Sequence, residues 1–145
     1  VYLNGEDVTK EIRTNDISMM ASKTSAVPMV RQKLVDLQKE IAKSKGYILD
    51  GRDICTVVLP DAEVKIFMNA DAKARAQRRY DEYINKGIDA DYETIYQDII
   101  ARDYQDSHRK ISPLKKADDA IEIDTSHLTI DEVVDAVLNI INKEI

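Results

Sequence analysis

The pattern of apolar and polar positions along the chain predicts strands that alternate with helices. Three short apolar runs, at residues 47–49, 64–68 and 120–123, are each followed by a helical pattern rather than by a hairpin turn. This alternation is typical of parallel strands that are joined by helical crossovers. The pattern therefore predicts an α/β fold built on a parallel sheet.

Helix start signals recur around these runs. The residues that can begin a helix are Thr14 or Asn15, Pro28, Asp71, Asp91 and Thr129. The first of these helices is expected to fade at residues 22–25, whereas Gly46 and Gly87 end the second and the third. Thr129 forms a capping box with Glu132 in front of a broad apolar stripe. Ahead of all the helices, Asn4-Gly5 predicts a small hairpin between residues 1–3 and 8–12.

Composition fits one domain with its own core. The chain has 145 residues, of which 43% are hydrophobic, and a net charge of −6. This acidic balance argues against a nucleic-acid polymer as partner, because domains that bind such polymers usually carry a basic face. No apolar stretch reaches the roughly 18 residues of a membrane span, and no signal-peptide layout is present. With Cys55 as the single cysteine, these features predict a cytoplasmic protein.

The first candidate site follows the apolar run at residues 47–49. Asp50-Gly51-Arg52-Asp53 would lie at the end of a strand, where open α/β sheets bind their ligands. The same four residues are also typical of a turn with an ordinary ion pair. Both interpretations stay open on these residues alone.

The second candidate is a charged stretch near the end of the fourth helix. Arg102, Asp103, Asp106 and Arg109 fall within two helical turns, which by itself fits a solvated helix face. The planar guanidinium of arginine, however, can donate two parallel hydrogen bonds to a phosphate, and phosphoryl transfer requires several such cationic groups. Because similar chemistry recurs at Arg52, a site for a small phosphate-bearing anion is the functional interpretation.

Metal and nucleophile chemistry has little support in the sequence. His108 and His127 have no cysteine or histidine neighbours at the spacing of metal ligands, so no metal site is expected. Cys55 and Ser107 have no partnering base at a recognisable spacing.

Segments along the whole chain resemble the bacterial cytidylate kinases. They are residues 1–8, 11–14, 21–22, 27–31, 50–53, 56–62 and 65–67, together with Arg102, Asp103, Asp106 and Arg109. The resemblance implies a P-loop nucleoside monophosphate kinase, in which a three-layer parallel sheet has helices on both faces. It implies transfer of the γ-phosphate of ATP to CMP or dCMP with Mg²⁺, by an enzyme that is a monomer at full length.

The resemblance also implies roles for individual residues. Arg31 and Asp53 would read the base, Ser22, Arg102 and Asp106 would hold the sugar, and Arg52 and Arg109 would hold the phosphate. Arg52, Arg102 and Arg109 would act in catalysis, and Arg78 or Arg79 would lie near the ATP side. A mobile lid is expected at about residues 75–112, whose closure would exclude water.

One part of the family pattern does not occur in these residues. The chain contains no G-x-x-x-x-G-K-[ST] loop, which in the family holds the ATP phosphates and lies with the first, central strand upstream of Val1. Residues 1–26 would then be the end of the insert that binds the nucleoside monophosphate, with its antiparallel remnant, and residues 27–145 the rest of the kinase core. We therefore expect this chain alone to be inactive and marginally stable.

Two other functions remain compatible with the sequence. One is a non-catalytic module that binds a nucleotide or a partner through its arginine-rich face. The other is a kinase for another small phosphate acceptor.

Overall fold

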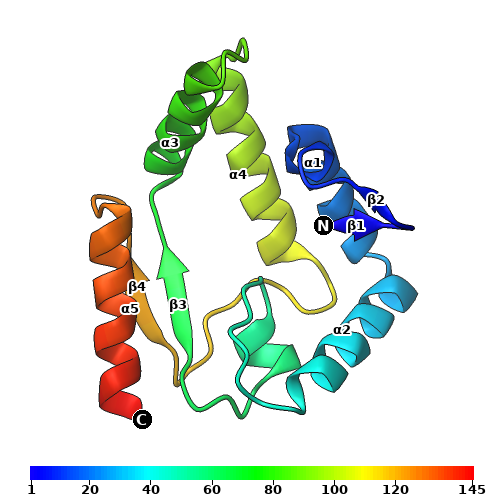
Figure 1. The fold of residues 1–145 in the computed structure, drawn as a ribbon, viewed down its shortest axis with the longest axis vertical. Coiled ribbons are helices and arrows are strands. Elements are labelled where there is room, and N and C mark those ends of the chain that lie inside the picture. Colours follow the sequence, from blue (N-terminus) through cyan, green and yellow to red (C-terminus); the bar gives the residue numbers. More distant parts are fainter.

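A small parallel sheet lies beside the C-terminal helix. The computed structural model describes residues 1–145, except for the side chain of Asn15. Strands β3 (Ile66–Asn69) and β4 (Ile121–Asp124) pair in parallel, and Ile66 lies opposite Ile121. Helix α5 (Ile130–Glu144) runs beside them and begins at the predicted Thr129 capping box (Figure 1). The α/β class and the parallel pairing of these two runs are confirmed.

The prediction of a strand at residues 47–49 is wrong. This segment has no regular secondary structure, and β3 and β4 are the strands of the parallel sheet within the described part of the chain. A strand is stable only when its backbone N–H and C=O groups pair with those of a neighbour, and none of the described strands pairs with this segment. Ile48 is accordingly 94% exposed. The wider three-layer sheet stays a prediction.

Helices α3 (Ala72–Asn85) and α4 (Tyr92–His108) form an antiparallel pair next to the sheet (Figure 1). Asp71 caps α3 and Asp91 caps α4, as predicted, since each carboxylate accepts a hydrogen bond from a backbone N–H in the first turn of its helix. The two helices pack through Tyr80 and Tyr92, whose rings meet edge to face at 6.3 Å. This pairing fixes the direction in which the charged end of α4 points.

The N-terminal part of the chain is a hairpin followed by two helices. Strands β1 (Tyr2–Leu3) and β2 (Glu6–Asp7) flank the predicted Asn4-Gly5 turn, so the returning strand is earlier than the predicted 8–12. A 3₁₀ turn, η1 (Glu11–Arg13), leads to α1 (Asn15–Ser25) and then to α2 (Pro28–Ala42). α1 does not fade at residues 22–25 but continues to Ser25, which places Ser22 on a regular helix.

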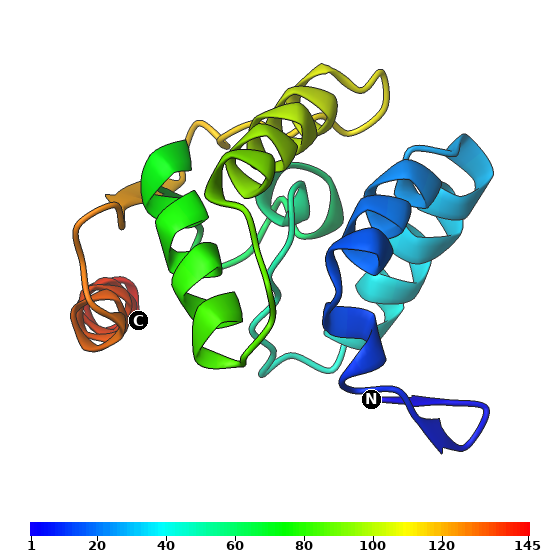
Figure 2. The same cartoon turned by 90° about the horizontal axis from the view of Figure 1, so that it is seen from above.

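A turn of π-helix, η2 (Ile54–Val58), anchors α2 to the middle of the molecule. Val35 of α2 packs against Ile54 and Val58 of η2, and all three side chains are at most 8% exposed. Viewed from above, α1 and α2 lie on one side of η2 and α3 on the other, with α4 next to η2 between them (Figure 2). The segment just before η2 therefore faces α1, α2 and α4 at once. None of the described helices is both long and apolar enough to cross a membrane.

Candidate functional site

A pocket of about 390 Å³ lies between α1, α2, α4 and the loop before η2. Its lining includes the seven side chains assigned above to the acceptor nucleotide, namely Ser22, Arg31, Arg52, Asp53, Arg102, Asp106 and Arg109. The structure thus brings together residues that are up to 87 positions apart in the chain. Their roles toward a ligand stay predictions, whereas their convergence is a property of the fold.

Local structure explains why these side chains face one another. Arg102, Asp106 and Arg109 are spaced by four and three residues, so they lie along one side of the end of α4. Arg31 lies in the first turn of α2, which Pro28 begins. Asp53 directly precedes η2, whose packing on α2 brings its carboxylate to that turn.

Arg31 and Asp53 form a buried ion pair at the floor of the pocket. Arg31 Nη2 contacts Asp53 Oδ2, and the two side chains are only 10% and 6% exposed. Arg109, which is 7% exposed, approaches from α4 with Nη2 at 4.0 Å from Asp53 Oδ1. A buried carboxylate is costly unless it is paired, and these two arginines supply the opposite charge that Asp53 requires in a site shielded from water.

Asp106 is the second buried carboxylate, and it is 3% exposed. It accepts hydrogen bonds from Ser22 Oγ at 3.1 Å and from Arg52 Nε at 3.3 Å. Arg102 Nε and Arg109 Nη1 lie farther away, at 3.7 and 4.0 Å. Asp106 therefore connects α1, the loop before η2 and α4 at one point.

The pocket has an excess of positive charge, since four arginines face two aspartates. Burial lowers the pKa of Arg102, and the neighbouring charge of Arg52 lowers it further. Burial also lowers the pKa of Arg109, followed by repulsion from Arg31. Arginine nevertheless stays protonated in proteins, so both guanidiniums are destabilised cations that an anion would stabilise.

Four buried polar atoms around the pocket have no hydrogen-bond partner among the described residues. They are Arg31 Nε, Asp53 Oδ2, Arg102 Nε and Arg109 Nη2. Asp53 Oδ2 touches Arg31 as an ion pair but without the angles of a hydrogen bond. Since buried polar groups are nearly always satisfied, the three arginine donors without a hydrogen-bond partner indicate a site for a polar ligand.

The structure adds two side chains that the sequence pattern did not predict. Gln105 Nε2 donates to Ser22 Oγ at 3.0 Å, and Ser18 Oγ accepts from Arg102 Nη1 at 2.7 Å. Gln105 directly precedes Asp106, and Ser18 lies one helical turn before Ser22. This proximity to predicted site residues is the only signal in the sequence that points to them. Asp103, which shares the charged stretch of α4, points instead toward α3 and pairs with Arg75.

Arg78 and Arg79 lie on α3, apart from this pocket. Arg78 Nη2 donates to the carbonyl oxygens of Thr125 and Ser126, after β4. Arg79 lies 3.5 Å from Glu82 and over the ring of Tyr83, at 5.3 Å. Their place on the ATP side stays a prediction.

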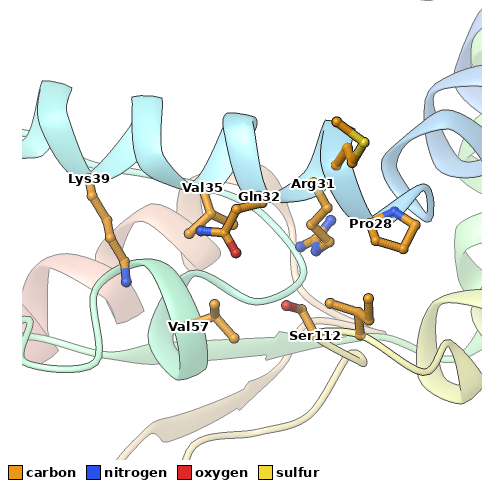
Figure 3. A pocket seen from close by; sticks show the side chains of 9 residues that line it. Pro28, Arg31, Gln32, Val35, Lys39, Val57 and Ser112 are labelled. Atoms are coloured by element: carbon orange, nitrogen blue, oxygen red, sulfur yellow. The ribbon is translucent and has the colours of Figure 1, made fainter.

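A second pocket, of about 420 Å³, lies between α2 and η2 (Figure 3). Val35 of α2 and Val57 of η2 face each other across it, and Lys39 closes one end. Arg31 and Val35 line both pockets. In the part of the chain that the structure describes, no group of three histidine, cysteine or acidic side chains is placed to hold a metal ion.

Known proteins of one family match almost the whole chain. The family model described as cytidylate kinase matches residues 1–143. The chain is 56% identical over 144 residues to a cytidylate kinase of Lactobacillus johnsonii, which covers 99% of this chain and 63% of that protein. It is also 56% identical over 143 residues to one of Ligilactobacillus salivarius, covering 99% of this chain and 64% of that protein. A cytidylate kinase of Streptococcus pyogenes serotype M4 is 55% identical over 134 residues, 92% of this chain and 59% of that protein.

The chain therefore spans less than two thirds of the length of these curated relatives. The match nevertheless extends from the N-terminal hairpin to α5, and it includes every residue of the pocket. The chain belongs to the cytidylate kinase family.

Proposed function

We propose that the pocket binds the phosphate acceptor, CMP or dCMP, of an enzyme that transfers the γ-phosphate of ATP to it. The observation that carries this proposal is the set of three buried arginine nitrogens without a hydrogen-bond partner, because a nucleotide offers the complementary acceptors. They suit a phosphate and the acceptor atoms of a base, and Asp53 Oδ1, which lies 4.0 Å from Arg109 Nη2, suits an amino group.

The Arg31–Asp53 pair supports recognition of the base. The Asp53 carboxylate can accept a hydrogen bond from the amino group of cytosine, and Arg31 can donate to the ring acceptors. Uracil carries an oxygen in place of that amino group, so it would turn an acceptor toward the carboxylate. A site with such a buried partner rejects the wrong base strongly, because its own polar atom is then left unpaired.

Asp106 and its neighbours suit the sugar and the phosphate. Ser22, Arg102 and Asp106 lie together and offer both donors and acceptors to sugar hydroxyl groups. Arg52 has a side chain that is 43% exposed, so its guanidinium can turn from Asp106 toward a phosphate. Arg109, which is buried, would hold the same phosphate from the other side. Closure of the proposed lid, at about residues 75–112, would exclude water from the transfer.

We propose that this chain on its own binds the acceptor but does not complete the transfer. The 145 residues contain no G-x-x-x-x-G-K-[ST] segment, whose backbone amides and lysine hold ATP phosphates in P-loop kinases. Arg78 and Arg79 would contribute to the ATP side in the longer enzyme. Mg²⁺ is usually held by substrate phosphates together with one or two carboxylates, so it would accompany ATP in the longer enzyme.

Isothermal titration of the chain with CMP, UMP and AMP tests the proposal. CMP should bind more tightly than UMP or AMP, and Arg31→Ala and Asp53→Ala should each remove most of the CMP affinity. Arg13→Ala is the matched control, because Arg13 is an exposed arginine on η1 outside the pocket. CMP binding that survives both pocket substitutions would refute the assignment.

Titration tests one of the two competing functions, and an activity assay tests the other. A kinase for another small acceptor would prefer a different nucleotide, and a preference for UMP would contradict the role of Asp53. A non-catalytic module would bind CMP without forming ADP from ATP, even when the chain is supplied as part of a full-length protein that contains the phosphate loop. ADP formation that depends on CMP in that longer protein would exclude this second alternative.

A further inference from the structure

Besides the Ser22–Asp106 hydrogen bond, two others join α4 to α1 next to the pocket, and we call these two the α1–α4 bridge. One runs from Gln105 Nε2 to Ser22 Oγ at 3.0 Å, between residues 83 positions apart. The other runs from Arg102 Nη1 to Ser18 Oγ at 2.7 Å, between residues 84 positions apart. Ser18 lies one helical turn before Ser22, so the two bonds follow one another along the same contact between helices.

The direction of the Gln105 bond follows from the chemistry of Ser22. The Ser22 hydroxyl donates a hydrogen bond to Asp106 Oδ1 at 3.1 Å, because a carboxylate oxygen accepts. The lone pairs of Ser22 Oγ are therefore free for the amide NH₂ of Gln105. Such a chain from amide to hydroxyl to carboxylate strengthens each of its hydrogen bonds and holds the hydroxyl in one orientation.

Ser18 has a corresponding effect on Arg102. Its hydroxyl accepts a hydrogen bond from Nη1 of Arg102, whose side chain is 33% exposed. Nε of the same guanidinium has no hydrogen-bond partner among the described residues. Arg102 is thereby held with Nε toward Asp106, at 3.7 Å from Oδ2. The free donor is thus presented to the pocket rather than to solvent.

We propose that Gln105 and Ser18 are positioning residues of the acceptor site. Neither side chain lines the pocket, so they act through Ser22 and Arg102, which they hold in the arrangement that receives the sugar of the nucleotide. This inference rests on the proposed function, because the sugar-side roles of Ser22, Arg102 and Asp106 come from there.

The first test separates positioning from a general structural role by using two probes, CMP and inorganic phosphate. Gln105→Ala should weaken CMP binding about fivefold, the equivalent of one neutral hydrogen bond. It should leave the affinity for inorganic phosphate unchanged, since Arg52 and Arg109 are untouched. Gln97→Ala is the matched control: Gln97 is an exposed glutamine of α4 whose amide bonds Glu93 within the same helix. Parallel loss of both affinities, or a loss no larger than in Gln97→Ala, would overturn the proposal.

The second test uses rescue at Ser18. Ser18→Ala should weaken CMP binding about fivefold, whereas Ser18→Thr keeps the hydroxyl and should restore most of the affinity. Ser44→Ala is the control, because Ser44 bonds only the carbonyl oxygen of Ile41 at the end of α2 among the contacts that the structure describes. Equal affinities of Ser18→Ala and Ser44→Ala would overturn the role of Ser18.

Amide hydrogen exchange distinguishes failure of this inference from failure of the proposed function. If the unsubstituted chain binds no CMP, the proposed function fails for this chain, and exchange within α1 still reports on the α1–α4 bridge. Several-fold faster exchange at residues 18–25 in Gln105→Ala and Ser18→Ala than in the two controls supports the bridge. Equal exchange in all four variants overturns it.

Discussion

Ser22 of α1 and Asp106 of α4 are 84 residues apart in the chain, and their side chains are joined by a hydrogen bond of 3.1 Å. Both side chains are buried, at 6% and 3% exposure. The pocket is therefore closed on this side by a contact between two helices that belong to different parts of the fold. Any change that separates α1 from α4 should weaken ligand binding without altering a residue of the base or phosphate region.

Replacing Asp106 by asparagine tests the balance of charge in the pocket. Asp106→Asn removes one of the two carboxylates that face four arginines, so the pocket becomes more positive. Inorganic phosphate should then bind more tightly, while CMP should bind at least tenfold more weakly, since a charged hydrogen bond contributes about 1.5–3 kcal/mol. Titration calorimetry with both ligands measures the two effects, and a parallel change in both affinities would contradict this division of roles.

Replacing Asp53 by asparagine tests base recognition. The amide of Asp53→Asn can donate a hydrogen bond to the oxygen of uracil, which the carboxylate cannot do. The preference for CMP over UMP should therefore fall by about tenfold or more. The substitution also leaves buried Arg31 without its counter-charge, which costs about 3–5 kcal/mol of folding free energy when a buried pair is broken. Titrations should accordingly be made well below the melting temperature of the variant, and an unchanged CMP to UMP ratio there would exclude Asp53 from base reading.

The local elements were predictable from the sequence, because each depends on nearby residues. Thr14, Asp71, Asp91 and Thr129 cap the helices that they were expected to begin. The parallel pairing of β3 with β4 also followed from the alternating pattern. The segment at residues 47–49 has the composition of a strand, but a strand depends on a neighbour, which the pattern of one segment does not reveal.

The candidate site was predictable in its members but not in its contacts. Arg102, Asp106 and Arg109 follow helical spacing, and the family resemblance added Ser22 and Arg31. The spacing placed Asp103 in the same group, yet its carboxylate turns to Arg75 of α3, because adjacent positions on a helix face different directions. Contacts between distant helices, such as Gln105 with Ser22, depend on the packing of the whole chain and left no local signal.

Core packing should matter more for stability than the charged contact between α3 and α4. Val58 of η2 is 2% exposed and packs against Ile54 of the same turn and Val35 of α2. Val58→Ala should cost about 2 kcal/mol of unfolding free energy through lost burial and a cavity. Arg75→Ala removes an ion pair whose side chains are 36% and 42% exposed, so it should cost less than about 1 kcal/mol. Urea denaturation compares the two, and a larger effect of Arg75→Ala would show that the α3–α4 contact dominates.

Many apolar side chains remain exposed, which predicts association of the isolated chain. Ile48 is 94% exposed, Met29 85% and Ile130 82%. Exposed apolar surface of this kind promotes contact between molecules. Light scattering should detect association that increases with protein concentration, and Ile48→Ser should reduce it. Ile12→Ser, at a position that is only 39% exposed, is the control that should change it less.

Acid should weaken α5 through its capping box. The backbone N–H and the hydroxyl of Thr129 both donate to Glu132, and they lower the pKa of this carboxyl below its ordinary 4.5. A carboxyl whose pKa is lower in the folded state stabilises the fold above its unfolded pKa, and this stabilisation is lost as the pH falls through the folded value. Unfolding by urea between about pH 3 and pH 7 should therefore show stability that declines below about pH 4.5. In Glu132→Gln this part of the decline should be absent, whereas Glu144→Gln, at the other end of α5, should decline like the unsubstituted chain. Identical pH profiles for Glu132→Gln and the unsubstituted chain would show that the capping box does not contribute to the acid sensitivity of the fold.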